Sequence, residues 1–139
     1  MLLSANKVEV GQEVPSLSKM VTQETSQAFS GWPEIGNFHT DPAIARKLGF
    51  PAVLMQGMLG AAYLSEMCMR FFGQSWYKGG ELSLSFINPV FPPQRLTAKG
   101  VVKEKTPEGD GMRLVLEVWL ENEQGQKMQV GTASAVVAA

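Results

Sequence analysis

The sequence has few of the side chains that bind metals or form cross-links. Its 139 residues include one cysteine, Cys68, and one histidine, His39. A single cysteine excludes an internal disulfide, and without a second cysteine or histidine the usual ligand set of a zinc site is missing. Cys68 lies between two methionines in an apolar stretch, which is typical of a small buried side chain. We expect neither a metal nor a cofactor.

The sequence also lacks a charge excess and a long hydrophobic run. The net charge is −1, and the lysines and arginines are scattered, so no nucleic-acid footprint is present. The longest apolar stretch, from about Leu54 to Phe72, is interrupted by polar residues and is too short to span a membrane. No basic segment followed by an apolar run opens the chain, so we expect no signal peptide. The sequence therefore predicts a cytoplasmic protein that binds neither nucleic acid nor membrane.

What the sequence does contain is typical of one folded domain. Hydrophobic residues make up 45% and charged residues 18% of the chain, a balance that favours a globular protein over a disordered one. A length of 139 residues suits one domain with its own core. We therefore expect residues 1–139 to form a single domain.

The first half of the chain carries signals for helices. Residues 8–14 alternate weakly and favour the start of a strand. Thr22 is suited to cap a short helix that Gly31 ends. Asp41 and the following proline predict the start of a second helix. A long helix is expected from about Leu54 to Phe72, and its apolar residues cover most of its circumference, so it should be buried.

The second half of the chain carries signals for strands. Alternating apolar residues, complete or partial, predict four strands, at 81–86, 95–105, 112–122 and 126–137, with turn signals at 108–111 and 122–125. Consecutive strands with short turns favour an antiparallel sheet. Together with the long helix, they predict an α+β fold in which a curved sheet wraps around that helix. Because exposed sheet edges are usually covered by pairing, we expect a homodimer or a dimer of dimers.

Two segments resemble a known motif. Residues 37–41, Asn-Phe-His-Thr-Asp, and residues 56–59, Gln-Gly-Met-Leu, are similar to the hydratase motif of the MaoC-like dehydratase family. That family includes the (R)-specific enoyl-CoA hydratases. The later run 86–90, Phe-Ile-Asn-Pro-Val, looks like a family strand that ends in a Pro-Val turn. The resemblance spans about residues 29–135 and implies the hot dog fold, an antiparallel sheet wrapped around a long central helix.

The resemblance also implies roles for individual residues. In the family pattern Asp-x-Asn-Pro-x-His, the histidine is His39 and the Asp position holds Glu34. The Asn and Pro positions hold Gly36 and Asn37, so only His39 is identical. Glutamate keeps the carboxylate but adds a methylene. The resemblance further implies that the backbone N–H of Gly57 binds the thioester oxygen and that a helix serine eight residues later, Ser65, supports the site. The side chains expected to contact substrate are those of Asn37, Gln56 and Met58.

The chemistry agrees with these assignments. Hydration of an enoyl thioester needs a water delivered to the β-carbon, a proton delivered to the α-carbon, and stabilisation of the developing enolate oxygen. A carboxylate and an imidazole that flank one water can perform both proton steps. N–H groups at the start of a helix can stabilise the oxygen. The sequence therefore predicts a hydro-lyase that reversibly adds water to a 2-enoyl thioester, carried by coenzyme A or an acyl carrier.

Other interpretations remain open. His39 can instead be a loop residue beside the helix that Asp41 begins, Ser65 a helix serine bonded to its own backbone, and Asn37 a turn residue. A hot dog thioesterase would use an acidic residue on the central helix, where Glu66 lies. The departures from the family pattern suggest a third possibility, an acyl-thioester binder without catalytic activity. A fourth is another reaction, such as dehydration or cyclisation of a polyketide-like substrate.

Overall fold

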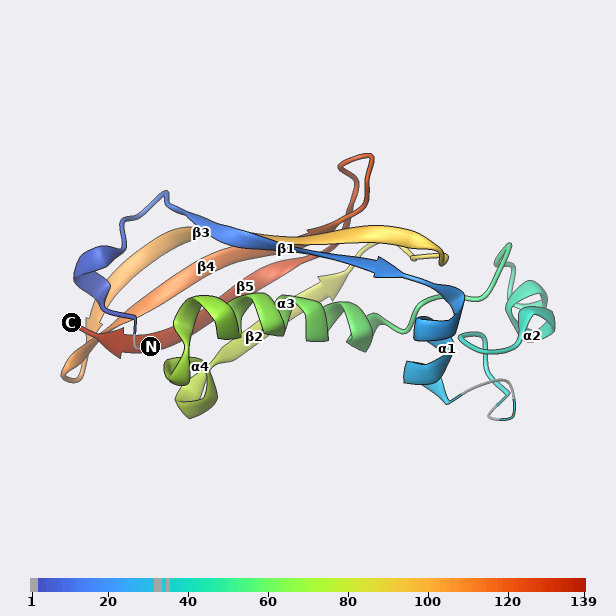
Figure 1. The fold of residues 1–139 in the computed structure, drawn as a ribbon, viewed down its shortest axis with the longest axis horizontal. Coiled ribbons are helices and arrows are strands. Elements are labelled where there is room, and N and C mark those ends of the chain that lie inside the picture. Colours follow the sequence, from blue (N-terminus) through green and yellow to red (C-terminus); the bar gives the residue numbers. More distant parts are fainter. Residues whose placement is uncertain (1–2, 32–33, 35) are drawn as a thin grey trace.

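The computed structural model describes residues 3–31, 34 and 36–139, and it shows a curved sheet wrapped around one long helix (Figure 1). The sheet has five strands in the order β1-β3-β4-β5-β2, and all neighbours are antiparallel. The elements are a 3-10 helix Ala5–Lys7, β1 Glu13–Val21, α1 Gln23–Ser30, α2 Pro42–Lys47, α3 Gly57–Phe72, α4 Gln74–Gly79, β2 Glu81–Phe86, β3 Gln94–Glu108, β4 Gly111–Glu121 and β5 Lys127–Ala138. The predicted α+β architecture is confirmed.

The helix ends follow the predicted capping signals. The Thr22 hydroxyl oxygen accepts a hydrogen bond from the backbone N–H of Thr25 at 3.0 Å and opens α1. Gly31, with φ of 96°, ends α1 in the left-handed conformation that glycine adopts without strain. An Asp41 carboxylate oxygen accepts from the N–H of Ala43 at 2.9 Å and opens α2. These short-range predictions are confirmed.

The long buried helix is confirmed, but it starts three residues later than expected. α3 begins at Gly57 rather than Leu54. The N–H of Met55 donates to the carbonyl of Val90 at 2.8 Å, and the N–H of Leu54 donates to the carbonyl of Phe38 at 3.2 Å. Gln56, with φ of −63° and ψ of 130°, is still extended, so the helix begins after it.

Two further elements differ from the sequence prediction. Residues 9–12 form a turn rather than the start of a strand, because the N–H of Gln12 donates to the carbonyl of Glu9 and Gly11 has a φ of 92°. β1 therefore begins only at Glu13. The short helix α4 was not predicted; the indole ring of its residue Trp76 stacks on Phe72 with centroids 5.7 Å apart. The turns that join β3, β4 and β5 lie where the sequence predicted them.

The core lies between α3 and the concave face of the sheet. Inward-facing residues of β4 are fully buried, namely Leu114, Leu116, Val118 and Leu120. Cys68 on α3 has no exposed surface, and burial raises the pKa of its thiol to about 12. A thiol that stays protonated at neutral pH is a poor nucleophile. The prediction that Cys68 is an inert packing residue is confirmed.

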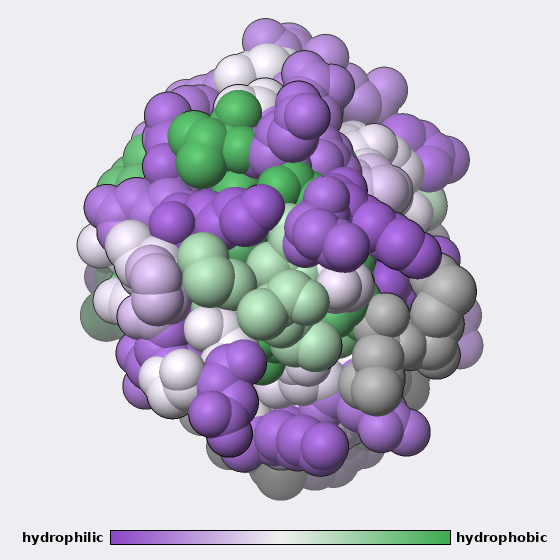
Figure 2. All heavy atoms as spheres, turned by 90° about the vertical axis from the view of Figure 1, so that its left-hand side faces the viewer, coloured by the Kyte–Doolittle hydropathy of each residue, from purple (hydrophilic) through white to green (hydrophobic). Residues whose placement is uncertain are grey.

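The two ends of the molecule differ in surface character. The end that carries α4 and the β3–β4 turn is mostly hydrophilic, with a smaller apolar area near its centre (Figure 2). Four large apolar residues are exposed around the start of α3: Phe29, Met58, Phe86 and Ile87, each with 44 to 57% of its surface accessible. Among the helices of the described residues, none combines the length and the apolar character needed to cross a bilayer.

Candidate active site

The loop before α2 holds His39 in a tight turn. The backbone N–H of His39 donates to Oδ1 of Asn37 at 2.8 Å. The carbonyl of Asn37 accepts from the N–H groups of Thr40 and Asp41, at 3.0 and 2.8 Å. Asparagine closes turns in this way because its side chain mimics a backbone acceptor. Asn37 therefore shapes the loop that carries His39; its predicted contact with substrate stays a prediction.

A backbone carbonyl selects the tautomer of the neutral His39 ring. Nδ1 lies 2.9 Å from the carbonyl oxygen of Leu54. Since a carbonyl oxygen can only accept, Nδ1 carries the hydrogen, and in the neutral ring Nε2 holds the lone pair. The ring is half-buried and packs against Phe38, with ring centroids 4.1 Å apart. Nε2 is therefore the atom of His39 that can take up a proton.

His39 and Gly57 line the same cavity, which we call the His39 cavity. Its volume is about 280 Å³. The other lining residues come from the segments before α3 and after β2 and from β5: Phe50, Leu54, Met55, Phe86, Ile87, Asn88, Pro89, Val90 and Gln129. The structure thus brings together two of the predicted catalytic residues, which are 18 positions apart in the sequence.

The start of α3 offers free backbone N–H groups to this cavity. Gln56 precedes the helix and makes no side-chain capping bond; its Oε1 accepts instead from the hydroxyl of Ser30 at 3.0 Å. The N–H of Gly57 has no hydrogen-bond partner among the described residues. An added Cβ at Gly57 would lie 2.3 Å from the ring of Phe86. A larger residue here would have to displace the Phe86 ring, and a first-turn N–H such as that of Gly57 has no acceptor within the helix.

A second hollow, the apolar groove, adjoins the His39 cavity. It has a volume of about 600 Å³ and lies between α1, α3 and β2. Its lining is almost entirely apolar: Phe29, Met58, Ala61, Ala62, Ser65, Leu82, Leu84 and Phe86. Phe86 lines both hollows and stands where they meet.

Ser65 lies in the apolar groove and not in the His39 cavity. Its Oγ accepts a hydrogen bond from the indole N–H of Trp76 at 3.0 Å. Eight residues along an α-helix correspond to a rise of about 12 Å, which separates Ser65 from Gly57. Met58 also faces the groove. The proposed contributions of Ser65 and Met58 therefore concern the groove side of the site and stay predictions.

Glu34 is exposed in the structure. It does not belong to the described residues that line the His39 cavity. Its neighbours at 32, 33 and 35 lie outside the described residues. The role of Glu34 as the second proton-transfer group therefore stays a prediction.

Glu66, the carboxylate of the thioesterase interpretation, is already engaged. Its two oxygens pair with Lys19 at 3.0 Å and with Arg70 at 2.9 Å. The hydrogen bond from Lys19 is the largest cause that lowers the pKa of Glu66. A carboxylate with a lowered pKa and two cationic partners is a weak base and a weak nucleophile. This arrangement disfavours Glu66 as a catalytic group.

The sequence analysis did not single out Gln129, which also lines the His39 cavity. Its Nε2 donates to the carbonyl of Gly57 at 2.8 Å, and only 3% of the residue is exposed. The inward-facing positions of β5 that follow it are Gly131, Ala133, Ala135 and Val137. A polar residue in an apolar alternation is the signal that would have identified it.

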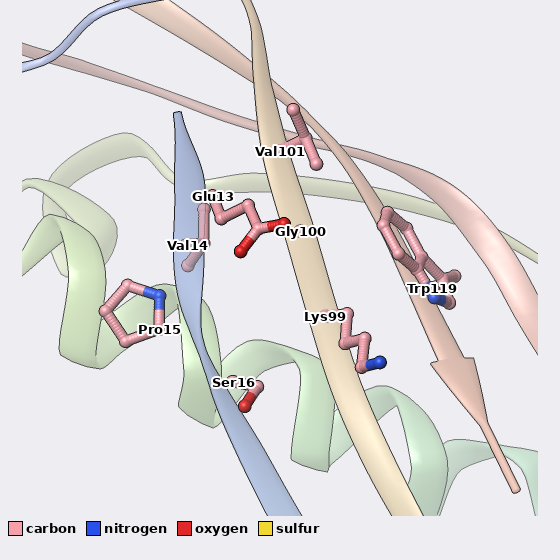
Figure 3. Close-up of a pocket in the computed structure, with 8 residues that line it drawn as sticks. All are labelled: Glu13, Val14, Pro15, Ser16, Lys99, Gly100, Val101 and Trp119. Carbon is pink, nitrogen blue, oxygen red and sulfur yellow. The ribbon is translucent and has the colours of Figure 1, made fainter. Parts of the chain in front are cut away.

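A third hollow lies on the outer face of the sheet, away from the predicted residues. It measures about 430 Å³ and lies along β1 and β3, beside Lys99 and Trp119 (Figure 3). The pairing of β1 with β3 shifts register between Val14 and Leu17, and this bulge leaves the hollow. Outward-facing Lys99 alternates with buried Ala98 on β3, so the hollow is separated from α3 by the sheet.

Comparison with known proteins supports the resemblance. No curated protein matches the sequence. Among solved structures, a MaoC-like dehydratase from Rhodospirillum rubrum is 25% identical, with a TM-score of 0.81 over 98% of this chain and 97% of that one. An (R)-hydratase from A. caviae, described as involved in PHA biosynthesis, is 26% identical, with a TM-score of 0.69 over 97% and 100% of the two chains. An R-hydratase from Pseudomonas aeruginosa is 22% identical, with a TM-score of 0.77 over 97% and 85%.

These neighbours confirm the hot dog fold that the resemblance implied. The MaoC like domain family matches residues 8–124, which include both the His39 loop and the start of α3. Since this match covers most of the sequence, the chain belongs to the MaoC-like domain family.

Proposed function

We propose that this protein is a hydro-lyase that reversibly adds water to a 2-enoyl thioester. The observation that carries the proposal is the shared cavity of His39 and Gly57. Its support is that one lining residue, His39, can accept a proton at Nε2 and that the other, Gly57, begins a 16-residue helix. Hydration of a polarised double bond requires a proton acceptor and an N–H donor of the protein to act on one bound ligand.

The proposed reaction balances as follows. The thioester oxygen accepts a hydrogen bond from the N–H of Gly57. Nε2 of His39 takes a proton from water as the water oxygen bonds to the β-carbon, and the displaced π electrons form the enolate. The imidazolium then returns a proton to the α-carbon, so one O–H bond and the C=C π bond break while one C–O and one C–H bond form. A donor of this kind typically lowers the barrier by about 3–4 kcal/mol.

We assign Glu34 as the second member of the acid–base pair, which holds the attacking water beside His39. This assignment follows from the family pattern, in which the carboxylate precedes the histidine by five positions. It requires the Glu34 carboxylate to reach the His39 cavity when an acyl thioester is bound. Glu34→Gln tests it: a fall in kcat of about 100-fold supports the assignment, and unchanged turnover removes Glu34 from the mechanism.

The apolar groove is the proposed site of the acyl chain. It adjoins the His39 cavity at Phe86 and is lined almost entirely by apolar side chains. An alkyl or aryl chain would bury its surface there, with a gain of about 0.8 kcal/mol per methylene. The thioester carrier would then extend from the opening of the His39 cavity, where coenzyme A or a carrier protein can be accommodated outside the fold.

We also propose a homodimer that acts in the cytoplasm. β2 is an edge strand with no second neighbour among the described strands. Exposed Phe29, Met58 and Phe86 lie beside that edge. Pairing with a second copy would cover the strand edge and close the open side of the apolar groove that these side chains line. Sedimentation at several concentrations tests the dimer: a monomeric wild type contradicts it, whereas a dimer that Met58→Glu weakens supports this face as the interface.

The central test is addition of water to crotonyl-CoA, followed by loss of enoyl-thioester absorbance. We expect turnover by the wild type and a chiral 3-hydroxyacyl product. Release of free thiol is measured in parallel, because it would indicate a thioesterase. Binding of several enoyl thioesters with no turnover of any of them would contradict the lyase and favour a non-catalytic binder.

A further inference from the structure

Gln129 is a polar residue buried in a largely apolar core. The inward side of β5 is otherwise built from small or apolar residues. Gln129 is 3% exposed, and its Oε1 has no hydrogen-bond partner among the described residues. A buried acceptor without a donor destabilises a fold, and an apolar side chain of similar length would avoid that penalty. The presence of glutamine is therefore not explained by core packing.

The other half of the amide has a defined partner. Nε2 of Gln129 donates to the carbonyl of Gly57 at 2.8 Å. Since that carbonyl can only accept, it fixes the orientation of the amide and leaves Oε1 on the opposite side. The bonded residue is the one whose N–H is proposed to bind the thioester oxygen. That carbonyl belongs to the peptide between Gly57 and Met58, so the bond ties the first residue of α3 to strand β5.

Neighbouring residues hold this contact in place. Gln129 and Phe86 are directly opposite on the paired strands β5 and β2. The Phe86 ring lies against Gly57, and the amide of Gln129 lies against Gly60, where an added Cβ would be 2.5 Å from Nε2. The first turn of α3 is thus held between two side chains of one cross-strand pair.

We propose that Gln129 is a positioning residue for the oxyanion-binding N–H of Gly57. Its Nε2 ties the Gly57 carbonyl to β5 and so holds the first residue of α3, together with its N–H, in place beside the His39 cavity. This inference rests on the proposed hydration activity. It assigns to Gln129 no contact with the reacting atoms; its effect passes through the backbone of Gly57.

Two substitutions at Gln129 test this role by hydration of crotonyl-CoA and by thermal unfolding. Gln129→Met keeps the length of the side chain and removes the donor. We expect kcat to fall about 10- to 100-fold with KM changed less than about threefold, since misplacement of a transition-state donor affects the rate more than binding. The melting temperature should stay equal or rise. Gln129→Glu places a carboxylate against the Gly57 carbonyl and should be equally slow at neutral pH.

The pH profile separates positioning from a merely structural role. A protonated glutamic acid can donate its O–H to the Gly57 carbonyl, so the kcat of Gln129→Glu relative to wild type should rise as the pH falls. Gln129→Met should show no such rise. Gln124→Met and Gln124→Glu, at an exposed turn position, are the matched controls and should behave as wild type. Should Gln129→Met fail to fold, Gly60→Ala displaces the native amide and should lower kcat in the same way.

The outcomes distinguish the two proposals. A wild type without turnover overturns both the hydration activity and the role of Gln129. An active wild type with unchanged kcat in Gln129→Met, or in Gly60→Ala if the former does not fold, overturns only the role of Gln129. If the ratio of the kcat of Gln129→Glu to the kcat of wild type stays constant across the pH range, positioning through this hydrogen bond is also contradicted.

Discussion

The His39 cavity and the apolar groove meet at Phe86, yet they are built in different ways. The cavity gathers groups from loops and element ends, and its polar atoms are fixed by backbone contacts such as the bond from Nδ1 of His39 to the Leu54 carbonyl. The groove is lined by side chains of α1, α3 and β2, and their sizes determine its shape. We infer that substitutions in the cavity change the rate, whereas substitutions in the groove change which substrate is accepted.

The largest expected effect is in the cavity, at His39. His39→Asn keeps an amide N–H that can reach the Leu54 carbonyl but removes the nitrogen that accepts a proton. We expect kcat for crotonyl-CoA hydration to fall by about 10²- to 10⁴-fold, the usual contribution of a positioned acid–base group. The melting temperature should change little, and thermal unfolding of the same sample checks that. Turnover within about threefold of wild type would remove His39 from the mechanism and leave it as a loop residue.

Gly57→Ala should give the next largest effect and also affects the fold. The added Cβ would lie 2.3 Å from the Phe86 ring. Overpacking of this kind costs about 1–3 kcal/mol of unfolding free energy, and displacement of the helix start should lower kcat as well. Urea unfolding and hydration kinetics measure the two effects. Gly79→Ala is the matched control, because no atom lies within 4 Å of its added Cβ. If Gly57→Ala and Gly79→Ala have the same unfolding free energy and the same kcat, the close packing of Gly57 is contradicted.

Phe86→Ala should change selectivity more than rate, because this ring stands between the two hollows. Its removal should let longer acyl chains pass from the groove to the cavity. We expect kcat/KM for an eight-carbon enoyl-CoA to rise about tenfold relative to crotonyl-CoA, the scale of discrimination that a few methylenes give. Ile87→Ala is the control, since Ile87 is similarly exposed but lines only the His39 cavity. An unchanged ratio in Phe86→Ala would place the acyl chain elsewhere.

The smallest effect is expected at Glu66, which lines neither the His39 cavity nor the apolar groove. Glu66→Gln should leave hydration unchanged and lower the unfolding free energy at pH 7 by about 0.2–1 kcal/mol, as expected for exposed ion pairs. The pKa of Glu66 is lowered by Lys19 and Arg70, so its contribution is present above the ordinary pKa of a glutamate and is lost as the pH falls through the lowered value. The two proteins should therefore become equally stable in acid. Urea unfolding of wild type and Glu66→Gln, at pH 7 and in acid below the lowered pKa of Glu66, measures the difference in stability.

Glu117→Gln provides the matched control for Glu66. Glu117 also forms an ion pair, with Lys103 at 3.0 Å, on the outer face of the sheet. It should show a similar small loss of stability and unchanged hydration. If Glu66→Gln alone abolished release of free thiol from an acyl-CoA, the thioesterase interpretation would be restored.

Features that depend on neighbouring residues were predictable from the sequence. Thr22, Gly31 and Asp41 act on backbone groups two to four positions away, and their capping roles were predicted correctly. The alternation of β4 likewise identified its buried face. His39 and Gly57 were identified by resemblance to a motif, and the fold then placed them in one cavity.

The sequence by itself determined the long helix, the capped short helices and the strands of the second half, and its resemblance to a family motif identified His39 and Gly57. Only the tertiary structure decided where α3 begins, that Ser65 faces the groove, and that Gln129 holds Gly57. The physical reason is the sequence separation over which each interaction acts. Capping and alternation act over a few residues, whereas the bond from Gln129 to Gly57 joins positions 72 apart. That contact exists only once the register of β5 against β2 and the packing of α3 on the sheet are fixed.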